Sequence, residues 1–369
     1  MAVVGGGITG ALVSHLLVKQ GVDTVLVDRE EVGLGSTAAS TGLLQYEVDT
    51  PLVELIQKVG ERNAVHAYRR GLSAIDELES LVGELNQACG FARRPALYLA
   101  SSQEDAVELG REYECRRHFG FDVAHWKSAE IRSMFGFSAP AAIFSRGDGE
   151  VDPYRLTQVL LASSRGQGLR AFQNTAVVQT EETATHVTLA TPRGKLVARM
   201  AIFATGYAAH EFFARGPGKL HTTYATASQV LGDLPQWPDR CLIWETARPY
   251  FYARRTADGR VLIGGEDTPF SDDHEQPGLL EAKAQRLARR FEKLFPGTSF
   301  EPEYRWAGTF AETKDGLPYI GAPPGHQRVM FALGYGGNGI TFSMIAAKLL
   351  SDLFRQQPNE DAAVFSFVR

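Results

Sequence analysis

A glycine-rich turn near the N-terminus is the feature that most restricts how this chain can fold. Residues 3–10 read Val-Val-Gly-Gly-Gly-Ile-Thr-Gly, and they join a short apolar strand to a helix that we expect over residues 8–20. Gly5, Gly7 and Gly10 match the G-x-G-x-x-G spacing. In that fingerprint the first glycine allows a tight turn, the second lets the backbone approach a pyrophosphate, and the third lets helix and strand pack closely. The turn therefore predicts a dinucleotide-binding α/β fold.

An acidic residue at the end of the next expected strand strengthens this prediction. The strand over residues 22–27 is followed by Asp28, which lies 18 residues after Gly10. This is close to the roughly 20 residues expected for the carboxylate that binds an adenosine ribose. The helix start adds free N–H groups and partial positive charge for the phosphates. We therefore expect Ile8, Thr9, Asp28 and Arg29 to contact the cofactor together with the three glycines.

A run of small residues follows and indicates which dinucleotide is bound. Residues 35–45 read Gly-Ser-Thr-Ala-Ala-Ser-Thr-Gly-Leu-Leu-Gln. This run resembles the loop of the D-amino-acid oxidase (DAO) family of FAD proteins, which includes glycine and sarcosine oxidases. The resemblance implies FAD, with Asp28 on the adenosine ribose and the loop along the pyrophosphate and ribityl chain. The implied contacts in the loop are Ser36, Thr37, Ala38, Ala39, Thr41, Gly42 and Leu43.

Three later motifs extend the resemblance over nearly the whole chain. Residues 204–206 read Ala-Thr-Gly after an apolar strand, residues 306–308 read Trp-Ala-Gly, and residues 331–341 form a glycine-rich run that opens a final helix. A helix start with free N–H groups would stabilise negative charge on the flavin. The resemblance implies cofactor contacts at Val177, Ala204, Thr205, Gly206, Gly308, Gly334, Gly336, Gly337, Asn338, Gly339, Ile340 and Thr341.

The expected fold class is α/β, or α+β counted over two domains. It combines a Rossmann-like FAD-binding domain of the glutathione-reductase type with an antiparallel-sheet substrate domain. We expect the FAD domain to be discontinuous over residues 1–90, 143–220 and 304–369, and the substrate domain to comprise residues 91–142 and 221–303. Locally, we expect Asp49-Thr50-Pro51 to start a helix, with a capping side chain followed by proline in the first turn. We also expect a turn at residues 147–149 and a strand over residues 171–178.

Composition excludes several other classes of protein. The hydrophobic fraction of 44% and the charged fraction of 22% are ordinary for a globular protein, and a net charge of −5 gives no reason to expect nucleic acid binding. Cys89, Cys115 and Cys241 are scattered, which argues against a disulfide scaffold or zinc site and suits the reducing cytoplasm. The nine histidines show no metal-ligand spacing. We expect no signal peptide and no membrane span.

The family resemblance implies that an amine or amino acid is oxidised to an imine, which water then hydrolyses. A flavin accepts a hydride from the carbon next to the nitrogen, so the protein must hold that C–H bond in place and exclude water. The electrons pass to O2 or to another acceptor. Two alternatives remain: a flavin dehydrogenase that acts on an alcohol or hydroxy acid, and a flavin subunit that depends on a partner protein.

One position departs from the glycine oxidase pattern. Those relatives carry an arginine two residues after Trp-Ala-Gly that pairs with the substrate carboxylate, and here that residue is Phe310. We expect Arg254 to replace it, or else to be a surface arginine. Tyr250 and Tyr252 alternate with Arg254, so they are candidates for the pocket lining or for sheet packing, and Gln45 is a further candidate. Sarcosine oxidases attach FAD through a cysteine where this chain has Gly308, so we expect non-covalent FAD.

Overall fold

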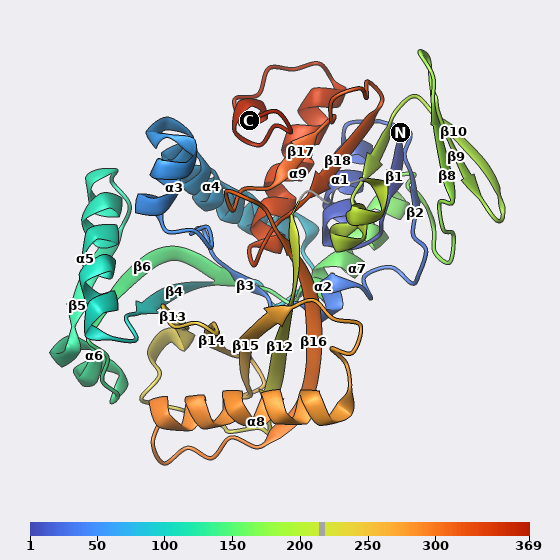
Figure 1. The fold of residues 1–369 in the computed structure, drawn as a ribbon. Coiled ribbons are helices and arrows are strands. Elements are labelled where there is room, and N and C mark those ends of the chain that lie inside the picture. The colour runs from blue at the N-terminus through green and yellow to red at the C-terminus, as the bar shows by residue number, and fades with distance from the viewer. Residues whose placement is uncertain (214–217) are drawn as a thin grey trace.

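The structure is a computed structural model that describes residues 1–213 and 218–369, and two large sheets organise it (Figure 1). The first sheet has six strands in the order β17-β18-β11-β1-β2-β7. Four of its pairings are parallel, and β17 runs antiparallel to β18. The strands are β1 (Ala2–Val4), β2 (Val25–Val27), β7 (Arg170–Phe172), β11 (Ala201–Phe203), β17 (Tyr319–Gly321) and β18 (Val329–Leu333).

Other elements cover both faces of this parallel sheet, and its strands are therefore almost entirely apolar. Val3, Leu26 and Ile202 point to one face and pack against α1 (Ile8–Lys19), α7 (Pro153–Gly166) and α9 (Gly339–Phe354). Val4, Val27 and Phe203 point to the other face, where they meet an antiparallel three-stranded sheet. That small sheet consists of β8 (Gln179–Glu182), β9 (Val187–Thr191) and β10 (Gly194–Ala198).

The second large sheet has nine strands and is mostly antiparallel, as the sequence predicted for the substrate domain. Its order is β16-β12-β15-β14-β13-β4-β6-β3, with β5 paired to β6 and a single parallel pairing between β13 and β4. The strands are β3 (Leu43–Leu44), β4 (Ala92–Leu99), β5 (Val123–Lys127), β6 (Ala141–Glu150), β12 (Lys219–Ser228), β13 (Leu242–Glu245), β14 (Phe251–Arg255), β15 (Val261–Pro269) and β16 (Pro302–Glu312).

The alternation of side chains in β14 and β15 divides the nine-stranded sheet into two different faces. Phe251, Ala253 and Ile263 join a core beneath α8 (Pro277–Leu294). Tyr250, just before β14, and Tyr252 lie on the opposite face, where they pack near Leu43. Leu43 belongs to the small-residue run 35–45, which we call the flavin loop after the cofactor that the resemblance implies. The face away from α8 is therefore the one that meets this loop of the parallel-sheet domain.

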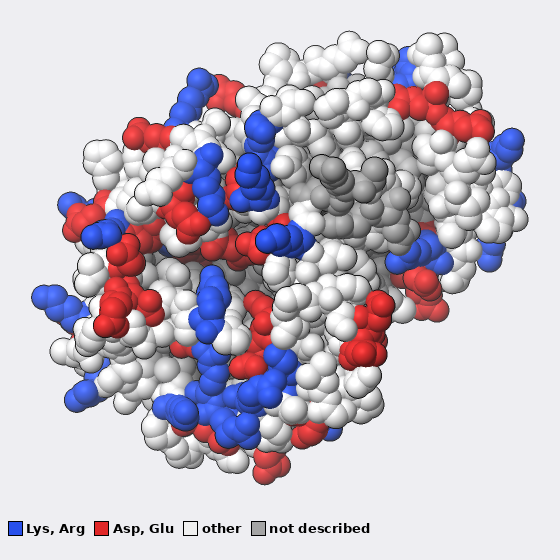
Figure 2. All heavy atoms as spheres, in the orientation of Figure 1, with Lys and Arg blue, Asp and Glu red and all other residues white. Residues whose placement is uncertain are grey.

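Figure 2 shows acidic and basic side chains interspersed on the surface, with Lys and Arg gathered most densely over α8.

The remaining helices and turns surround these sheets. They are α2 (Ser36–Ala39), α3 (Leu52–Val59), α4 (Glu61–Leu85), α5 (Gln103–His118), α6 (Ser128–Phe135), α10 (Asp361–Val364) and the 3-10 turns η1 (Gly206–Phe212) and η2 (Pro238–Arg240). Strands β6 and β16 belong to the nine-stranded sheet, although most of their residues were expected in the FAD domain. The domain boundaries expected from the sequence therefore remain a proposal. In residues 1–213 and 218–369, no helix is long and apolar enough to cross a membrane.

Three local predictions were wrong, each because a distant partner decides the structure. Asp49 does not cap α3, whose first N–H groups donate instead to Glu112 from α5. Residues 147–149 are not a turn, because they lie inside β6 and pair with β3 and β4. The strand expected over residues 171–178 ends at Phe172, where its pairing with β2 ends.

Candidate functional site

The N-terminal turn can be built only with glycine at two of the three fingerprint positions. Gly5 has a φ of +106°, and a Cβ there would lie 2.3 Å from the carbonyl oxygen of Ala204. A Cβ on Gly10 would lie 1.8 Å from the carbonyl oxygen of Gly5. The turn is therefore held between α1 and the end of β11, as the fingerprint requires.

A cavity of about 820 Å³ opens at the carboxyl ends of β1, β2 and β11. This is where doubly wound sheets bind dinucleotides. The lining residues that the sequence predicted are Gly5, Gly7, Ile8, Thr9, Asp28, Arg29, Ser36, Thr37, Val177, Ala204, Thr205, Gly206, Gly339 and Ile340. Predicted contacts outside this lining are Gly10, Ala38, Ala39, Thr41, Gly42, Leu43, Gly308, Gly334, Gly336, Gly337, Asn338 and Thr341.

Two side chains hold the wall of this cavity in place. The Asp28 carboxylate accepts hydrogen bonds from the backbone N–H groups of Gly6 and Glu30, and it thereby fixes the turn to the end of β2. The Thr37 hydroxyl accepts a hydrogen bond of 2.9 Å from the N–H of Ile8. Because the N-cap residue Gly7 has no side chain, and Thr37 takes up only the N–H of Ile8, further N–H groups of the helix start remain available to phosphates.

The end of the flavin loop is fastened to the start of α9. The carbonyl oxygen of Gln45 accepts hydrogen bonds from Asn338 Nδ2 at 3.3 Å and Thr341 Oγ1 at 3.0 Å. The other side of the loop meets β16, since Trp306 Nε1 donates to the carbonyl oxygen of Ala39 at 2.8 Å. The structure thus brings three predicted motifs together at one end of the cavity.

Tyr252 of β14 and Tyr250, just before that strand, lie beside this junction, with ring centroids 6.0 Å apart. Burial raises the pKa of Tyr252 to about 12, and hydrogen bonding with the side chains of Thr41 and Thr223 opposes the shift. Burial, followed by the nearby Asp49 carboxylate, raises the pKa of Tyr250 well above its usual range, while a side-chain hydrogen bond with Gln45 lowers it. Both tyrosines are therefore neutral at physiological pH and can serve as hydrogen-bond donors.

Asp49 is a further residue at this junction that the sequence did not single out for the site. Its Oδ2 accepts a hydrogen bond of 2.6 Å from the N–H of Gly337. Asp49 keeps contact with solvent, but the protein atoms around it raise the pKa of its carboxyl group. We call Gln45, Asp49, Tyr250 and Tyr252 the loop-end cluster.

Phe310 lies on β16, where it pairs across the sheet with His221 of β12. The two rings are stacked, with centroids 5.4 Å apart and an interplanar angle of 21°. His221 Nε2 is in turn 3.2 Å from Glu312 Oε2. The phenyl ring therefore covers one side of an imidazole, and no guanidinium is present at the position where the glycine oxidases carry arginine.

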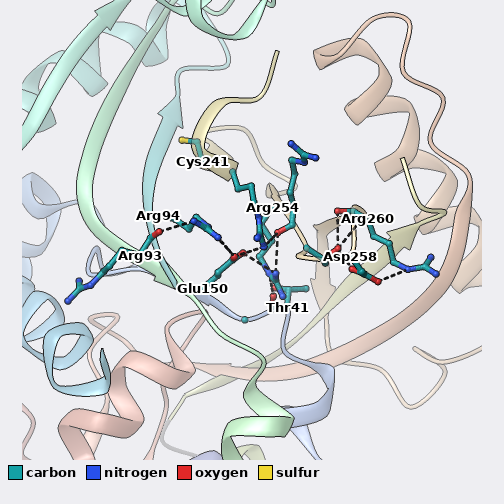
Figure 3. A network of polar contacts seen from close by, with 12 residues as sticks. Thr41, Arg93, Arg94, Glu150, Cys241, Arg254, Asp258 and Arg260 are labelled. Atoms are coloured by element: carbon teal, nitrogen blue, oxygen red, sulfur yellow. Dashed lines mark hydrogen bonds and ion pairs between the residues drawn. The ribbon is translucent and has the colours of Figure 1, made fainter. Parts of the chain in front are cut away.

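Arg254, which the sequence suggested as a ligand of a substrate carboxylate or as a surface arginine, contacts Thr41 and Glu150 (Figure 3). Its Nε donates to the carbonyl oxygen of Thr41, and its Nη1 is 3.2 Å from Glu150 Oε2. Glu150, which is 2% exposed, also binds Arg94 and Arg240. The guanidinium of Arg254 thus connects the flavin loop to a buried carboxylate.

Comparison with known proteins agrees with this geometry. The family described as "FAD dependent oxidoreductase" (DAO) matches residues 1–353. The chain belongs to this family. It is 28% identical to glycine oxidase from Bacillus licheniformis over 96% of this chain and 93% of that protein. It is 23% identical to gamma-glutamylputrescine oxidoreductase from Escherichia coli over 96% of this chain and 83% of that protein.

Solved structures confirm the expected fold. The crystal structure of glycine oxidase from Geobacillus kaustophilus superposes with a TM-score of 0.85 at 24% identity, covering 100% of this chain and 98% of that one. L-proline dehydrogenase from P. horikoshii superposes with a TM-score of 0.81 at 18% identity over 97% of this chain and 94% of that one. This chain is therefore an FAD-dependent oxidoreductase with the DAO fold, as the sequence predicted.

Sequence reasoning missed part of the cofactor cavity in this oxidoreductase. Asn174 and Thr175 line the cavity just after β7, and the N–H of Thr175 donates to the carbonyl oxygen of Asp28 at 2.7 Å. The signal was their place after a parallel strand, but the strand was expected to continue through residue 178. The other lining residues outside the predicted site set are Val4, Glu30, Glu31, Gly33, Leu34, Gly35, Ser40, Pro153, Ala176, Tyr207, Ala208, Phe212, Tyr335 and Ser343.

Proposed function

We propose that this FAD-dependent oxidoreductase oxidises the C–N bond of an amine or amino acid. Bound FAD would supply the hydride acceptor for the carbon next to nitrogen, and water would hydrolyse the imine product to a carbonyl compound and an amine or ammonia. The observation that carries the proposal is the loop-end cluster, where the two neutral tyrosines at the start of β14, Tyr250 and Tyr252, meet the loop end and the glycine run before α9. The similarity to proteins named glycine oxidase supports it.

We propose the following placement for FAD along the cavity. Asp28 and Val177 hold the adenosine end, and the uncapped start of α1 with Thr37 holds the pyrophosphate. The loop that ends at Gln45 and the start of α9 hold the ring end. When bound, FAD supplies the hydride acceptor, and the N-terminus of α9 favours negative charge at this end of the cavity.

The chain needs little acid–base machinery for such a reaction. Its groups must hold the substrate C–H bond against the cofactor and exclude water, which is a task of orientation. Tyr250, Tyr252 and Phe310 supply apolar surface for this, and the tyrosine hydroxyls supply hydrogen bonds. The side chain of Gln45, which interacts with Tyr250, closes the loop side.

We also propose that FAD is bound without a covalent link and that the protein works in the cytoplasm. Gly308, the position of the sarcosine oxidase cysteine, lies against Ala39 of the loop and offers no nucleophile. Cys89, Cys115 and Cys241 are all free thiols, which suits a reducing compartment. Flavin that stays with the polypeptide after denaturation and acid precipitation would contradict the non-covalent link.

Anaerobic reduction of the bound flavin tests the proposed reaction. The FAD-loaded protein is mixed with a panel of primary and secondary amines, amino acids and 2-hydroxy acids, and the loss of flavin absorbance is followed. Bleaching by amines or amino acids, but not by hydroxy acids, is expected. Bleaching by hydroxy acids alone would identify an alcohol-type dehydrogenase, and peroxide formation on admitting air would identify O2 as the electron acceptor.

A further inference from the structure

The glycine run before α9 accommodates the carboxylate of Asp49. A Cβ on Gly336 would lie 2.7 Å from Asp49 Oδ2, and a Cβ on Gly337 would lie 3.0 Å from both carboxylate oxygens. The run is itself tied to β16, because the N–H of Gly336 donates to the carbonyl oxygen of Ala311 at 3.0 Å. Tyr335 and Gly339, on either side of these glycines, line the cofactor cavity. A carboxylate is therefore fixed next to the ring end of that cavity.

The charged groups around Asp49 leave an excess of negative charge. Asp267 and Glu312 act on it as like charges, and Arg248 is the cation that acts on it. Glu312 Oε2 lies 3.2 Å from His221 Nε2. Neither Asp49 nor Asp267 has an ion-pair partner within 4.0 Å among the described residues. The Oδ1 atom of Asp267 is buried and has no hydrogen-bond partner among those residues.

Arg248 does not neutralise this pair of carboxylates. Its guanidinium lies over the ring of Tyr250, 4.7 Å from the centroid, and donates to the carbonyl oxygens of Thr246 and Ala247. The residue is exposed to solvent. His221 and Lys283 also act on Asp267, but Lys283 donates to the backbone of Glu266 and lies over Tyr224 on the opposite face of the sheet.

The aromatic side chains nearby are compatible with a cation. Tyrosine faces attract ammonium groups within about 6 Å of the ring centroid. Tyr250 lies close enough to Asp49 for the carboxylate to raise the pKa of its hydroxyl, so ring and carboxylate share one environment. An alkyl chain can pack on the aromatic rings while its charged end reaches the carboxylates.

We propose that the substrate carries, besides the amine that is oxidised, a second positively charged group that binds Asp49 and Asp267. The substrate class is thus an alkyl diamine or a similar dication, in contrast to a small α-amino acid held by its carboxylate. Although Asp49 is exposed to solvent, desolvation by the protein atoms around it, followed by the neighbouring Asp267 and Glu312, raises the pKa of its carboxyl group against the lowering effects of Gly337 and Arg248, and a bound cation would offset this shift. This inference rests on the proposed amine oxidation.

Matched substrates of equal chain length test this inference. The probes are 1,4-diaminobutane, butylamine and 4-aminobutyrate, which end in an ammonium, a methyl group and a carboxylate. Anaerobic flavin bleaching and kcat/KM are measured with the FAD-loaded protein. The diamine is expected to exceed butylamine by at least roughly 10-fold, the lower end of a charge-assisted hydrogen bond, and 4-aminobutyrate is expected to be the poorest.

Substitutions then assign the effect to the two carboxylates. Asp49→Asn and, independently, Asp267→Asn should lower kcat/KM for the diamine by roughly 10- to 100-fold and lower that for butylamine much less. Glu181→Gln, an exposed acid on β8, is the control and should change neither value. Two separate variants keep the test informative if one of them fails to fold or to retain flavin.

Each remaining outcome has a distinct meaning. If butylamine or 4-aminobutyrate matches the diamine, the second cationic group is wrong while amine oxidation stands. If the diamine is preferred but both aspartate variants keep that preference, the assignment to Asp49 and Asp267 is wrong. If none of the three probes bleaches the flavin, the second cationic group is wrong, and the proposed amine oxidation is overturned only if the wider panel of amines and amino acids also fails.

Discussion

Arg254 and Thr41 are joined by a hydrogen bond from the guanidinium Nε to the backbone carbonyl oxygen, although 213 residues separate them in the chain. The same guanidinium pairs with Glu150, so the flavin loop is anchored to the second sheet through a buried ion pair. From these contacts we propose that Arg254, which the sequence suggested for binding a substrate carboxylate, positions the flavin loop.

We predict that Arg254→Ala lowers FAD retention and reduces kcat/KM for carboxylated and uncarboxylated substrates by similar factors. The expected loss is about 1.5–3 kcal/mol, because a hydrogen bond to a charged group is removed. FAD release on dilution and kcat/KM for a plain amine and an amino acid are the measurements. Arg93→Ala, which breaks exposed pairs with Asp76 and Glu79, should change little. A loss confined to carboxylated substrates would return Arg254 to substrate binding.

We predict that Asp28→Ala weakens FAD binding by roughly 10- to 100-fold, corresponding to about 1.5–3 kcal/mol for a charge-assisted hydrogen bond. The carboxylate holds the glycine turn through the N–H of Gly6 and lines the adenosine end of the cavity. Titration of the apoprotein with FAD, followed by flavin fluorescence, measures the change. Unaltered affinity would remove Asp28 from the cofactor site.

We predict opposite effects for two Gly→Ala substitutions in helices. Gly10→Ala should destabilise the protein by about 1–3 kcal/mol or more and lower FAD binding, because the new Cβ meets the backbone of Gly5. Gly110→Ala in α5 meets nothing within 4 Å and should stabilise by about 0.5–1 kcal/mol. Chemical denaturation of both variants tests this contrast, and equal effects would contradict it.

We predict that Arg116→Met destabilises the protein by about 3–5 kcal/mol, because it leaves buried carboxylates without their cation. Arg116 is 2% exposed and binds Glu47 and Glu112, and the latter also holds the first N–H groups of α3. Arg117→Met, next to it but in an exposed pair with Glu114, should cost less than about 1 kcal/mol. Similar losses in the two variants would show that burial is not the cause.

We predict that glycine and D-alanine are poor substrates and that Phe310→Arg improves them relative to hydrophobic amines. A carboxylate without a cationic partner must shed water at a cost of several kcal/mol, whereas a new guanidinium could pair with it. The comparison is kcat/KM for glycine, D-alanine and N-alkyl amines in both proteins. Efficient glycine oxidation by the unmodified protein would show that the phenyl ring does not form this wall.

Short-range patterns in the sequence predicted the features that depend on neighbouring residues. The glycine spacing and Asp28 predicted the cofactor turn, and Asp258-Gly259, a dipeptide typical of hairpin turns, lies between β14 and β15. Helix α7 begins after Asp152, whose carboxylate caps it as the Asp-Pro pattern predicts. These features are decided within a few residues, because turns, caps and periodicity are local properties of the backbone.

Tertiary structure alone decided which polar groups meet across the two domains. Asp49 looked like a helix cap, but its carboxylate binds Gly337, 288 residues away, while Glu112 caps α3 in its place. Arg254 looked exposed, but Glu150 and Thr41 enclose it. Buried charges and N–H groups must find partners wherever the fold supplies them, and that supply depends on the pairing of distant strands, which no local pattern in the sequence encodes.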